Sequence, residues 1–347
     1  MPDGLVIIDK SQGVTSHDVV AAVRSVLHVK RVGHAGTLDP MATGVLVVGF
    51  GHATRLLNYI VDHHKTYEAT IRLGQRTTTE DAEGEIVVWP AREREHVRAQ
   101  VAALSREAIE QTISAHLLGE ISQIPSAYSA VKINGKHAYD LAREGRDVVL
   151  EPRQVTIDSF DVLAVHEPDA AQGTRDVDVR VTCSAGTYIR ALARDLGDML
   201  GVGGYLTRLR RTRVGAFSVE GPHVLTARSE EYSFTTRDGR HETRMRARLG
   251  VTKEQLLDAS LTMGQAARMT MPAVDITDGQ ARDLRYGRSI DVTVPDATAA
   301  IAHPAGREED VVAIIIPDTK TPSQSHPTVV FPALFPDALT FARVDAA

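Results

Sequence analysis

The sequence predicts an α+β fold with a mixed, mostly antiparallel sheet flanked by helices, and three observations support this prediction. Apolar segments, some alternating with polar residues, predict strands at 4–10, 45–48, 67–73 and 177–183. Apolar residues at helical spacing predict helices from Thr15 or Ser16 onward and from Ile189 to Leu200. These segments follow one another without a regular βαβ rhythm, which disfavours a parallel α/β sheet.

The N-terminal elements follow in order. After the strand at 4–10 and a turn at 11–13, Thr15 or Ser16 caps a helix on which Val19, Val23 and Leu27 keep helical spacing. A glycine-rich loop at 33–44 precedes the strand at 45–48. The alternating strand at 67–73 is expected to be half-buried.

The middle of the chain mixes both element types. Residues 94–117 are polar and helix-prone, with apolar positions on one face, and 130–136 read as a strand entering an Asn-Gly hairpin turn. After the strand at 177–183, a helix presents Ile189, Leu192 and Leu196 on one side. Gly201 is expected to end this helix.

Two later segments differ from the rest of the chain in amino-acid composition. Residues 228–248 are rich in charge and Thr and poor in apolar residues, so a charged surface insertion or mobile loop is expected there. From about 271 onward, a strand at 273–276, a helix at 278–286 and strands near 289–294, 311–316 and 328–331 indicate a small β-rich domain. We therefore predict two domains, at 1–270 and 271–347, which the length of 347 residues permits.

Composition excludes several function classes. The single cysteine, Cys183, cannot form an intrachain disulfide, and no Cys/His cluster has zinc spacing. No glycine-rich phosphate-binding motif suggests a nucleotide cofactor, and no apolar run reaches membrane-spanning length. We expect a cytoplasmic protein without metal or cofactor. The net charge of −6 is unlike that of a general nucleic-acid binder, so any RNA contact would depend on local charge.

The segment with the most chemical information runs from Gly33 to Gly44 and contains Thr37-Leu38-Asp39-Pro40. Its glycines permit backbone angles that let a loop approach a ligand closely. Pro40 fixes the chain after Asp39 and disfavours helix there, so the carboxylate can be aimed at a substrate. Taken alone, an Asp-Pro pair is more often a simple surface turn.

Five motifs in one order along the chain favour a catalytic loop over a simple surface turn. The loop resembles the signature loop of the TruB family of tRNA pseudouridine synthases, and 5–13 is similar to that family's opening strand and turn. Three further stretches look like later family motifs, at 65–77, 123–132 and 183–190, and Leu209-Arg210-Arg211 looks like the last. The resemblance spans residues 5 to about 219. It implies a pseudouridine synthase fold followed by a PUA-like RNA-binding domain.

The resemblance also implies roles for individual residues. Asp39 would be the catalytic nucleophile. Arg190 would pair with it, and Tyr67 would stack on the flipped uracil. The substrate-binding set implied in full is His34, Tyr67, Tyr188, Arg190 and Leu209, where His34 fills the space that the extruded nucleotide leaves. Without the motifs, Tyr67 would be an ordinary strand tyrosine and Arg190 a solvated helix arginine.

Basic residues near these motifs are candidates for RNA phosphate contacts. The candidates are Lys10, Lys30, Arg31, Lys132, Arg208, Arg210 and Arg211, with Arg213 in the same cluster. The alternative interpretation is an ordinary solvated run of charge.

The implied activity is the isomerisation of uridine to pseudouridine at position 55 in the T loop of tRNA. The implied partner is the T stem-loop of tRNA, and the implied state is a monomer. One alternative is an RNA-guided enzyme of the same superfamily, although the Lys-rich tails common there are missing from this sequence. A second alternative is a tRNA-folding chaperone without catalysis.

Overall fold

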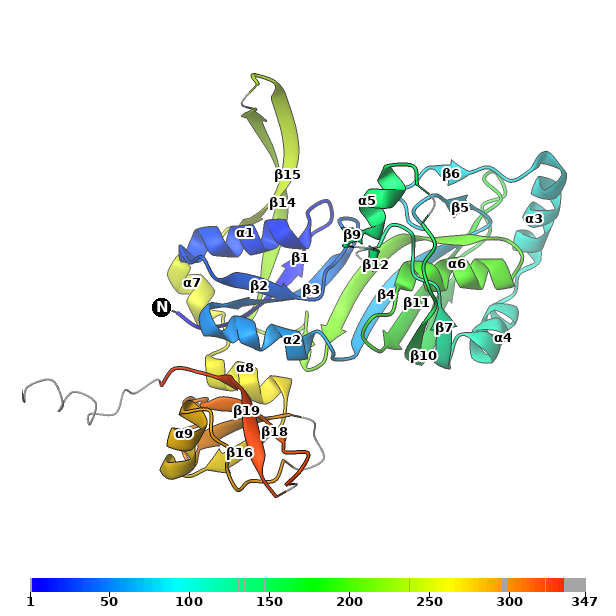
Figure 1. The fold of residues 1–347 in the computed structure, drawn as a ribbon. Helices are drawn as coiled ribbons and strands as arrows, with labels where there is room; N and C mark the ends of the chain where they lie inside the picture. The colour runs from blue at the N-terminus through cyan, green and yellow to red at the C-terminus, as the bar shows by residue number, and fades with distance from the viewer. Residues whose placement is uncertain are drawn as a thin grey trace, which may run out of the picture.

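A computed structural model describes residues 2–333 except 130, 134, 147, 237, 295–298 and 322. Its centre is an 11-stranded mixed sheet with the strand order β15-β14-β1-β3-β12-β4-β11-β10-β7, to which β2 and β13 add at the side (Figure 1). The pairs β1–β14 and β3–β12 are parallel, and the other neighbours along this order are antiparallel. The predicted α+β class with a mixed, mostly antiparallel sheet is confirmed.

The N-terminal half of this sheet is covered by one long helix. Its elements are β1 (Gly4–Lys10), α1 (Ser16–Leu27), β2 (Val32–Ala35), β3 (Thr43–Phe50), the 3₁₀ helix η1 (Gly51–Arg55) and α2 (Leu57–Ile60). Thr15 is the N-cap of α1 and forms a capping box with Asp18. Val19, Val23 and Leu27 are buried against the even-numbered apolar residues of β1. The predicted loop at 33–44 is shorter than expected, because 32–35 pair with β3.

The other half of the sheet carries three helices on one face (Figure 1). The strands are β4 (Lys65–Leu73), β7 (Gly119–Gln123), β10 (Arg153–Val165), β11 (Arg175–Cys183), β12 (Gly204–Val214) and β13 (Phe217–Ser218). The helices are α3 (Ala91–Ala103), α4 (Arg106–His116) and α6 (Ile189–Met199). The helical stretch expected at 94–117 is divided, because Leu104 is extended and Ser105 caps α4.

Short elements lie beside this half. They are β5 (Arg76–Thr77) with β6 (Ile86–Val87), β8 (Lys132–Ile133) with β9 (Lys136–His137), and α5 (Ala138–Arg143). The pairing of β8 with β9 confirms the hairpin expected near 130–136, although Ala130 and Asn134 lie outside the described residues.

The segment at 228–248 is not a loop. It forms most of β14 (Val224–Thr235) and β15 (His241–Leu249), which pair from Ala227–Leu249 to Thr235–His241 and project away from the body (Figure 1). The expectation of a mobile loop was wrong because both faces of the outer part are exposed, so polar and charged residues replaced the apolar alternation that marks a strand.

The C-terminal part contains a second sheet of four strands, which are β16 (Ala273–Ile276), β17 (Ala300–Pro304), β18 (Ala313–Pro317) and β19 (Ser325–Val330). Its helices are α7 (Lys253–Asp258), α8 (Met263–Thr270) and α9 (Asp278–Arg285). The strand at β17 was not predicted, and the strand expected at 289–294 is absent from the described residues, where Ile290 makes one bridge to Ser325.

The two sheets share a hydrophobic core. Leu5 and Ile7 of β1 belong to the same buried cluster as Ile301, Val311 and Ile314 of the C-terminal part. The second sheet is therefore packed against the body. No helix within the described part of the chain is long and apolar enough to cross a membrane.

Candidate active site

Asp39 lies on a short loop, residues 36–42, between β2 and β3. The Ser16 hydroxyl donates to the Leu38 carbonyl and accepts from the Leu38 amide, at 3.1 and 2.8 Å. The Gly13 amide donates to the Pro40 carbonyl at 2.8 Å. The start of α1 and the turn before it therefore fix the loop from one side.

Two buried basic residues hold the loop from the other side. The Arg211 guanidinium donates to the carbonyls of Val45, at 2.8 Å, and Gly36, at 3.0 Å. The Lys10 ammonium donates to the carbonyls of Val14, at 2.7 Å, and Pro40, at 3.3 Å, and burial lowers its pKa to about 8. Both side chains are buried, which corrects their assignment as RNA contacts. They fix the shape of the backbone around Asp39.

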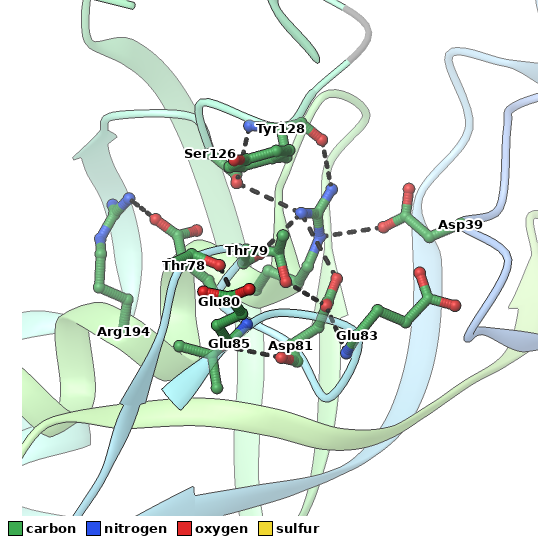
Figure 2. A network of polar contacts seen from close by, with 12 residues as sticks. Asp39, Thr78, Thr79, Glu80, Asp81, Glu83, Glu85, Ser126, Tyr128 and Arg194 are labelled. Atoms are coloured by element: carbon green, nitrogen blue, oxygen red, sulfur yellow. Dashed lines mark hydrogen bonds and ion pairs between the residues drawn. The ribbon is translucent and has the colours of Figure 1, made fainter. Parts of the chain in front are cut away.

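Arg190 pairs with the Asp39 carboxylate. Its Nε lies 3.0 Å from Asp39 Oδ2, and its side chain is 5% exposed against 37% for Asp39. The other guanidinium nitrogens donate to the carbonyls of Thr79 and Tyr128, both at 2.9 Å (Figure 2). Because these contacts hold both terminal nitrogens, Arg190 has one orientation, with its Nε directed at the carboxylate.

Asp39 and Arg190 stand at a cavity of about 470 Å³. Its wall includes four further side chains, Lys65, Tyr67, Tyr188 and Leu209. Tyr67 is buried, and burial raises its pKa, so the phenol stays neutral. The cavity wall therefore combines aromatic and apolar side chains with the carboxylates of Asp39 and Asp62. The structure brings together the predicted residues Asp39, Tyr67, Tyr188, Arg190 and Leu209.

His34 lies in a second, adjoining cavity of about 370 Å³. His17, Glu83 and Tyr128 line the same space, and Asp39 and Arg190 line both cavities. Burial is the main cause that lowers the pKa of His34, which favours the neutral ring. Asp39 thus sits on the partition between two spaces, with His34 behind it.

The arginines beside Leu209 point the other way. In the pairing of β12 with β4, Leu209 and Arg211 lie opposite Ala69 and Tyr67, whereas Arg208 and Arg210 lie opposite Thr70 and Glu68. Since neighbours along a strand face opposite sides, Arg208 and Arg210 are on the sheet face away from the cavity.

On the sheet face away from the cavity, Arg208 and Arg210 lie beside carboxylates of the same chain. Arg210 binds the Asp9 carboxylate with two nitrogens, at 2.9 and 2.7 Å, and Arg208 lies 3.8 Å from Asp178. We therefore withdraw both residues as phosphate contacts near Asp39. Lys30 and Arg31 are exposed just before β2 and remain candidates. Lys132 lies in β8, but its side chain is outside what the structure describes.

Residue-by-residue reasoning missed several members of the site. Lys65 lines the first cavity, donates to the carbonyls of Val61 and His63 at 2.6 Å each, and has its pKa lowered to about 8 by burial. Gln123 clamps the Tyr188 backbone with two hydrogen bonds, at 2.9 and 3.1 Å. Both residues lie inside the motifs at 65–77 and 123–132, so the motifs could have pointed to them. A lysine or a glutamine by itself does not predict a role in the site.

The Glu83 carboxyl was also missed. It lines the second cavity, and its pKa is raised by burial and by the carboxylates of Asp81 and Asp39. Cys183 is buried in the sheet, and burial raises the pKa of its thiol to about 11, which agrees with a core role. Within the described part of the chain, no group of three or more His, Cys, Asp or Glu side chains could hold a metal ion.

Known proteins match both halves of the large sheet. The family model for the N-terminal domain of TruB family pseudouridylate synthases matches residues 24–189, and the model for the tRNA pseudouridylate synthase B C-terminal domain matches 190–269. The tRNA pseudouridine synthase B of Bifidobacterium longum strain NCC 2705 is 50% identical, over 95% of this chain and 98% of its own. That of Arthrobacter sp. strain FB24 is 48% identical, over 84% of this chain and 83% of its own.

Solved structures agree on the fold. A Cbf5-Nop10-Gar1 complex contains a chain with a TM-score of 0.64 and 25% identity, covering 96% of this chain and 85% of that chain. An H/ACA RNP bound to a substrate RNA contains one with a TM-score of 0.62 and 23% identity, at the same coverage. The ordered motifs, the Asp39–Arg190 pair and these matches lead to one conclusion: the chain belongs to the TruB family of pseudouridylate synthases.

Proposed function

We propose that this enzyme converts uridine to pseudouridine at position 55 in the T loop of tRNA, with Asp39 as the nucleophile. The observation that carries this proposal is the carboxylate of Asp39, paired with the buried Arg190 at the edge of an aromatic-walled cavity. Relatives at 50% and 48% identity over most of the chain are tRNA pseudouridine synthases B, which supports tRNA as the substrate.

The reaction rearranges one bond of the nucleotide. The bond from the sugar to N1 of uracil breaks, the base turns, and a bond from the same sugar carbon to C5 forms. The proton on C5 leaves, and N1 gains one, so the net change is an isomerisation. Asp39 acts as a covalent nucleophile or drives release of the base. Arg190 favours the charged carboxylate and holds it in one orientation.

The walls of the cavity protect the reacting base. A uridine in an RNA loop must leave its stack to reach a carboxylate, which places the base against Tyr67. Tyr188 and Leu209 close the space around it and exclude water while the base is detached or turning. We propose that His34, behind Asp39 in the second cavity, occupies the space that the extruded nucleotide vacates.

The two alternatives are less well supported. The chains in the Cbf5-Nop10-Gar1 complex and in the H/ACA RNP are 25% and 23% identical to this chain, far below the 50% of the Bifidobacterium longum tRNA pseudouridine synthase B. A chaperone without catalysis would not need a carboxylate held by a buried arginine with every nitrogen engaged. Tyr67 and Leu209 complete a cavity that serves chemistry on a flipped base.

We also propose a division of labour along the chain. Residues 1–270 form the catalytic unit, and 271–347 form a PUA-like RNA-binding unit. The separate four-stranded sheet β16-β17-β18-β19 supports this division. The exposed Lys30 and Arg31 are candidates to contact phosphates of the T stem-loop, and the enzyme acts as a monomer.

The test is to map the product on a tRNA transcript with the purified chain alone. Pseudouridine at position 55, and at the same uridine in an isolated T stem-loop, is the expected result. Modification that requires an added guide RNA or protein would contradict the proposal in favour of the guided alternative. Faster tRNA refolding without any pseudouridine would contradict it in favour of the chaperone alternative.

A further inference from the structure

The outer part of the β14–β15 hairpin, residues 228–249, is an arm that the catalytic site does not use. It projects from the body past the side of α1 (Figure 1). The inner rungs, Ala227, Ala247 and Leu249, belong to the core beneath α1. Beyond them no residue of the arm that the structure describes is buried, although Tyr232 and Phe234 are there. Aromatic side chains at such a position need a reason other than core packing.

One face of the arm is a ladder of arginines and aromatic rings. The pairing places Arg228, Glu230 and Tyr232 opposite Arg248, Arg246 and Arg244, and Phe234 opposite Glu242. Tyr232 and Phe234 stack, with ring centroids 5.7 Å apart and planes 14° apart. The Arg246 guanidinium lies 4.4 Å from the Tyr232 centroid, and the Arg244 guanidinium lies 5.2 Å from the Phe234 centroid.

Contacts between the two strands that stabilise the hairpin itself explain only some of the side chains on this face. Cross-strand pairs of this kind stabilise a free-standing hairpin. However, Tyr232 is 43% exposed, and the ion pairs of Arg246 and Arg248 share one partner, Glu230, at the long distances of 3.9 and 3.7 Å. The side chains of Arg246 and Arg248 are 40% and 57% exposed, so both remain accessible to a ligand.

The charge of the arm runs against that of the chain. Residues 228–249 contain six arginines and four acidic residues, whereas the whole chain has a net charge of −6. Guanidinium groups spaced along a strand match the repeating phosphates of RNA, and exposed ring faces match unstacked bases. The net positive charge of the arm, together with this match, favours RNA over a protein as its partner.

The base of the arm adjoins the Asp39 loop. The Ser11 amide donates to the Ala227 carbonyl at 3.2 Å, and two residues later the Gly13 amide donates to the Pro40 carbonyl at 2.8 Å. A strand rises about 3.3 Å per residue, so the stretch 228–235 reaches roughly 25 Å from this point. An RNA with one nucleotide at Asp39 has neighbouring segments within that distance.

We infer that the Arg/aromatic face of the arm is a second RNA-binding surface, which contacts the substrate away from the nucleotide that is isomerised. The arginines contact phosphates, and the exposed face of Tyr232 supports an unstacked base. This inference rests on the proposed function, because it takes RNA as the substrate. The arm adds to substrate affinity and takes no part in the bond rearrangement.

The experiment measures the binding of a tRNA transcript over a series of salt concentrations for an Arg244→Gln/Arg246→Gln variant. We expect the Kd to rise roughly tenfold and the slope of log K against log salt to fall by about 2, one unit for each lost phosphate contact. The kcat at saturating tRNA should be unchanged. Arg244→Lys/Arg246→Lys keeps the charge and should keep the slope, and Tyr232→Phe should keep the affinity that Tyr232→Ala loses.

The matched control is Arg92→Gln on α3, where the side chain is 85% exposed. A Kd and a salt slope that stay at the control's values in the arm variants would overturn the inference. So would a loss confined to the melting temperature, which would leave stabilisation of the hairpin as the whole role. Turnover of wild type in the same assay separates the two claims: an inactive wild type contradicts the proposed function, whereas an active wild type with unaffected arm variants contradicts the arm alone.

Discussion

Two buried guanidinium groups beside Asp39 have different tasks. Arg190 meets the carboxylate itself, with Nε 3.0 Å from Oδ2. Arg211 binds backbone carbonyls on both sides of the loop, at Gly36 and Val45. The first fixes the reacting group and the second fixes the loop that carries it.

The pairing geometry of Arg190 predicts that Arg190→Lys is a severe change. A lysine keeps the charge but loses the planar fork, so the carboxylate is no longer held at one angle and the Thr79 and Tyr128 carbonyls lose their donors. We expect kcat to fall roughly 100-fold, as for a small misplacement of a reacting group. Stability should fall by about 2 kcal/mol.

Arg194 gives the matched control for Arg190. It lies one turn further along α6 and pairs with Glu80 and Asp195, away from the Asp39 carboxylate. Arg194→Lys should leave kcat close to that of wild type. Equal losses in single-turnover assays of the two variants would mean that Arg190 acts only through the fold.

The buried ammonium of Lys65 predicts a pH dependence of stability. Burial lowers its pKa from 10.5 to about 8, so between these values the unfolded chain binds the proton that the folded chain has lost. The contribution of Lys65 to stability should therefore rise from pH 8 toward pH 10.5 and be lost as the pH falls through 8. Urea unfolding of wild type and Lys65→Met at pH 7.5 and 9.5 measures it. The free energy of unfolding of wild type minus that of Lys65→Met should rise from pH 7.5 to pH 9.5, and a value that stays constant or falls would contradict this assignment.

At the scale of the element, the junction of the Asp39 loop with β3 and β12 depends on Gly44. Its φ is +102°, and a Cβ there would overlap the carbonyl oxygen of Arg211. The parallel pairing of β3 with β12 at Gly44 and Arg211 needs this close approach of two backbones.

Gly44→Ala should therefore destabilise the protein by about 3 kcal/mol. Because the shift would pass to the Asp39 loop, kcat should fall as well. Gly49→Ala in the same strand is the control, since the three atoms nearest to its added methyl all belong to the side chains of Leu5 and Leu57, which can shift more easily than backbone. Denaturant unfolding that gives the same loss for both variants would show that the junction is not specially constrained.

Sequence reasoning succeeded where a local rule decides the structure. The N-cap candidates Thr15 and Ser16 and the alternation at 67–73 predicted α1 and β4 with little error. It failed where distant partners decide. The arm at 228–248 is a strand pair whose two faces meet solvent, so it lacks apolar alternation. Arg208, Arg210 and Arg211 are consecutive or nearly so, yet only the register of β12 against β4 shows that Arg211 faces the cavity side and is buried.

At the scale of the whole molecule, the two sheets share one of their hydrophobic clusters. Ile314 of β18 packs in the same cluster as Leu5 and Ile7 of β1. The only tryptophan in the sequence, Trp89, packs against the separate core beneath α3, α4 and α6. Its fluorescence therefore reports on a region remote from Ile314.

We expect Ile314→Ala to lower the unfolding midpoint seen by Trp89 fluorescence, because a shared core makes the chain unfold as a unit. The loss should be about 3 kcal/mol, as for other buried Ile-to-Ala changes. Far-UV circular dichroism should give the same midpoint. An unchanged Trp89 transition beside a lowered dichroism transition would show instead that the C-terminal part unfolds on its own.

The most direct test of the central proposal is tritium release from a tRNA transcript that carries 5-tritiated uridine. The label leaves C5 when that carbon bonds to the sugar, so release counts isomerisation events. We expect release with the wild-type chain and none with Asp39→Asn, while the variant still binds tRNA. Release by Asp39→Asn at the wild-type rate would show that Asp39 is not the nucleophile, and no release by wild type from any tRNA would contradict the proposed activity itself.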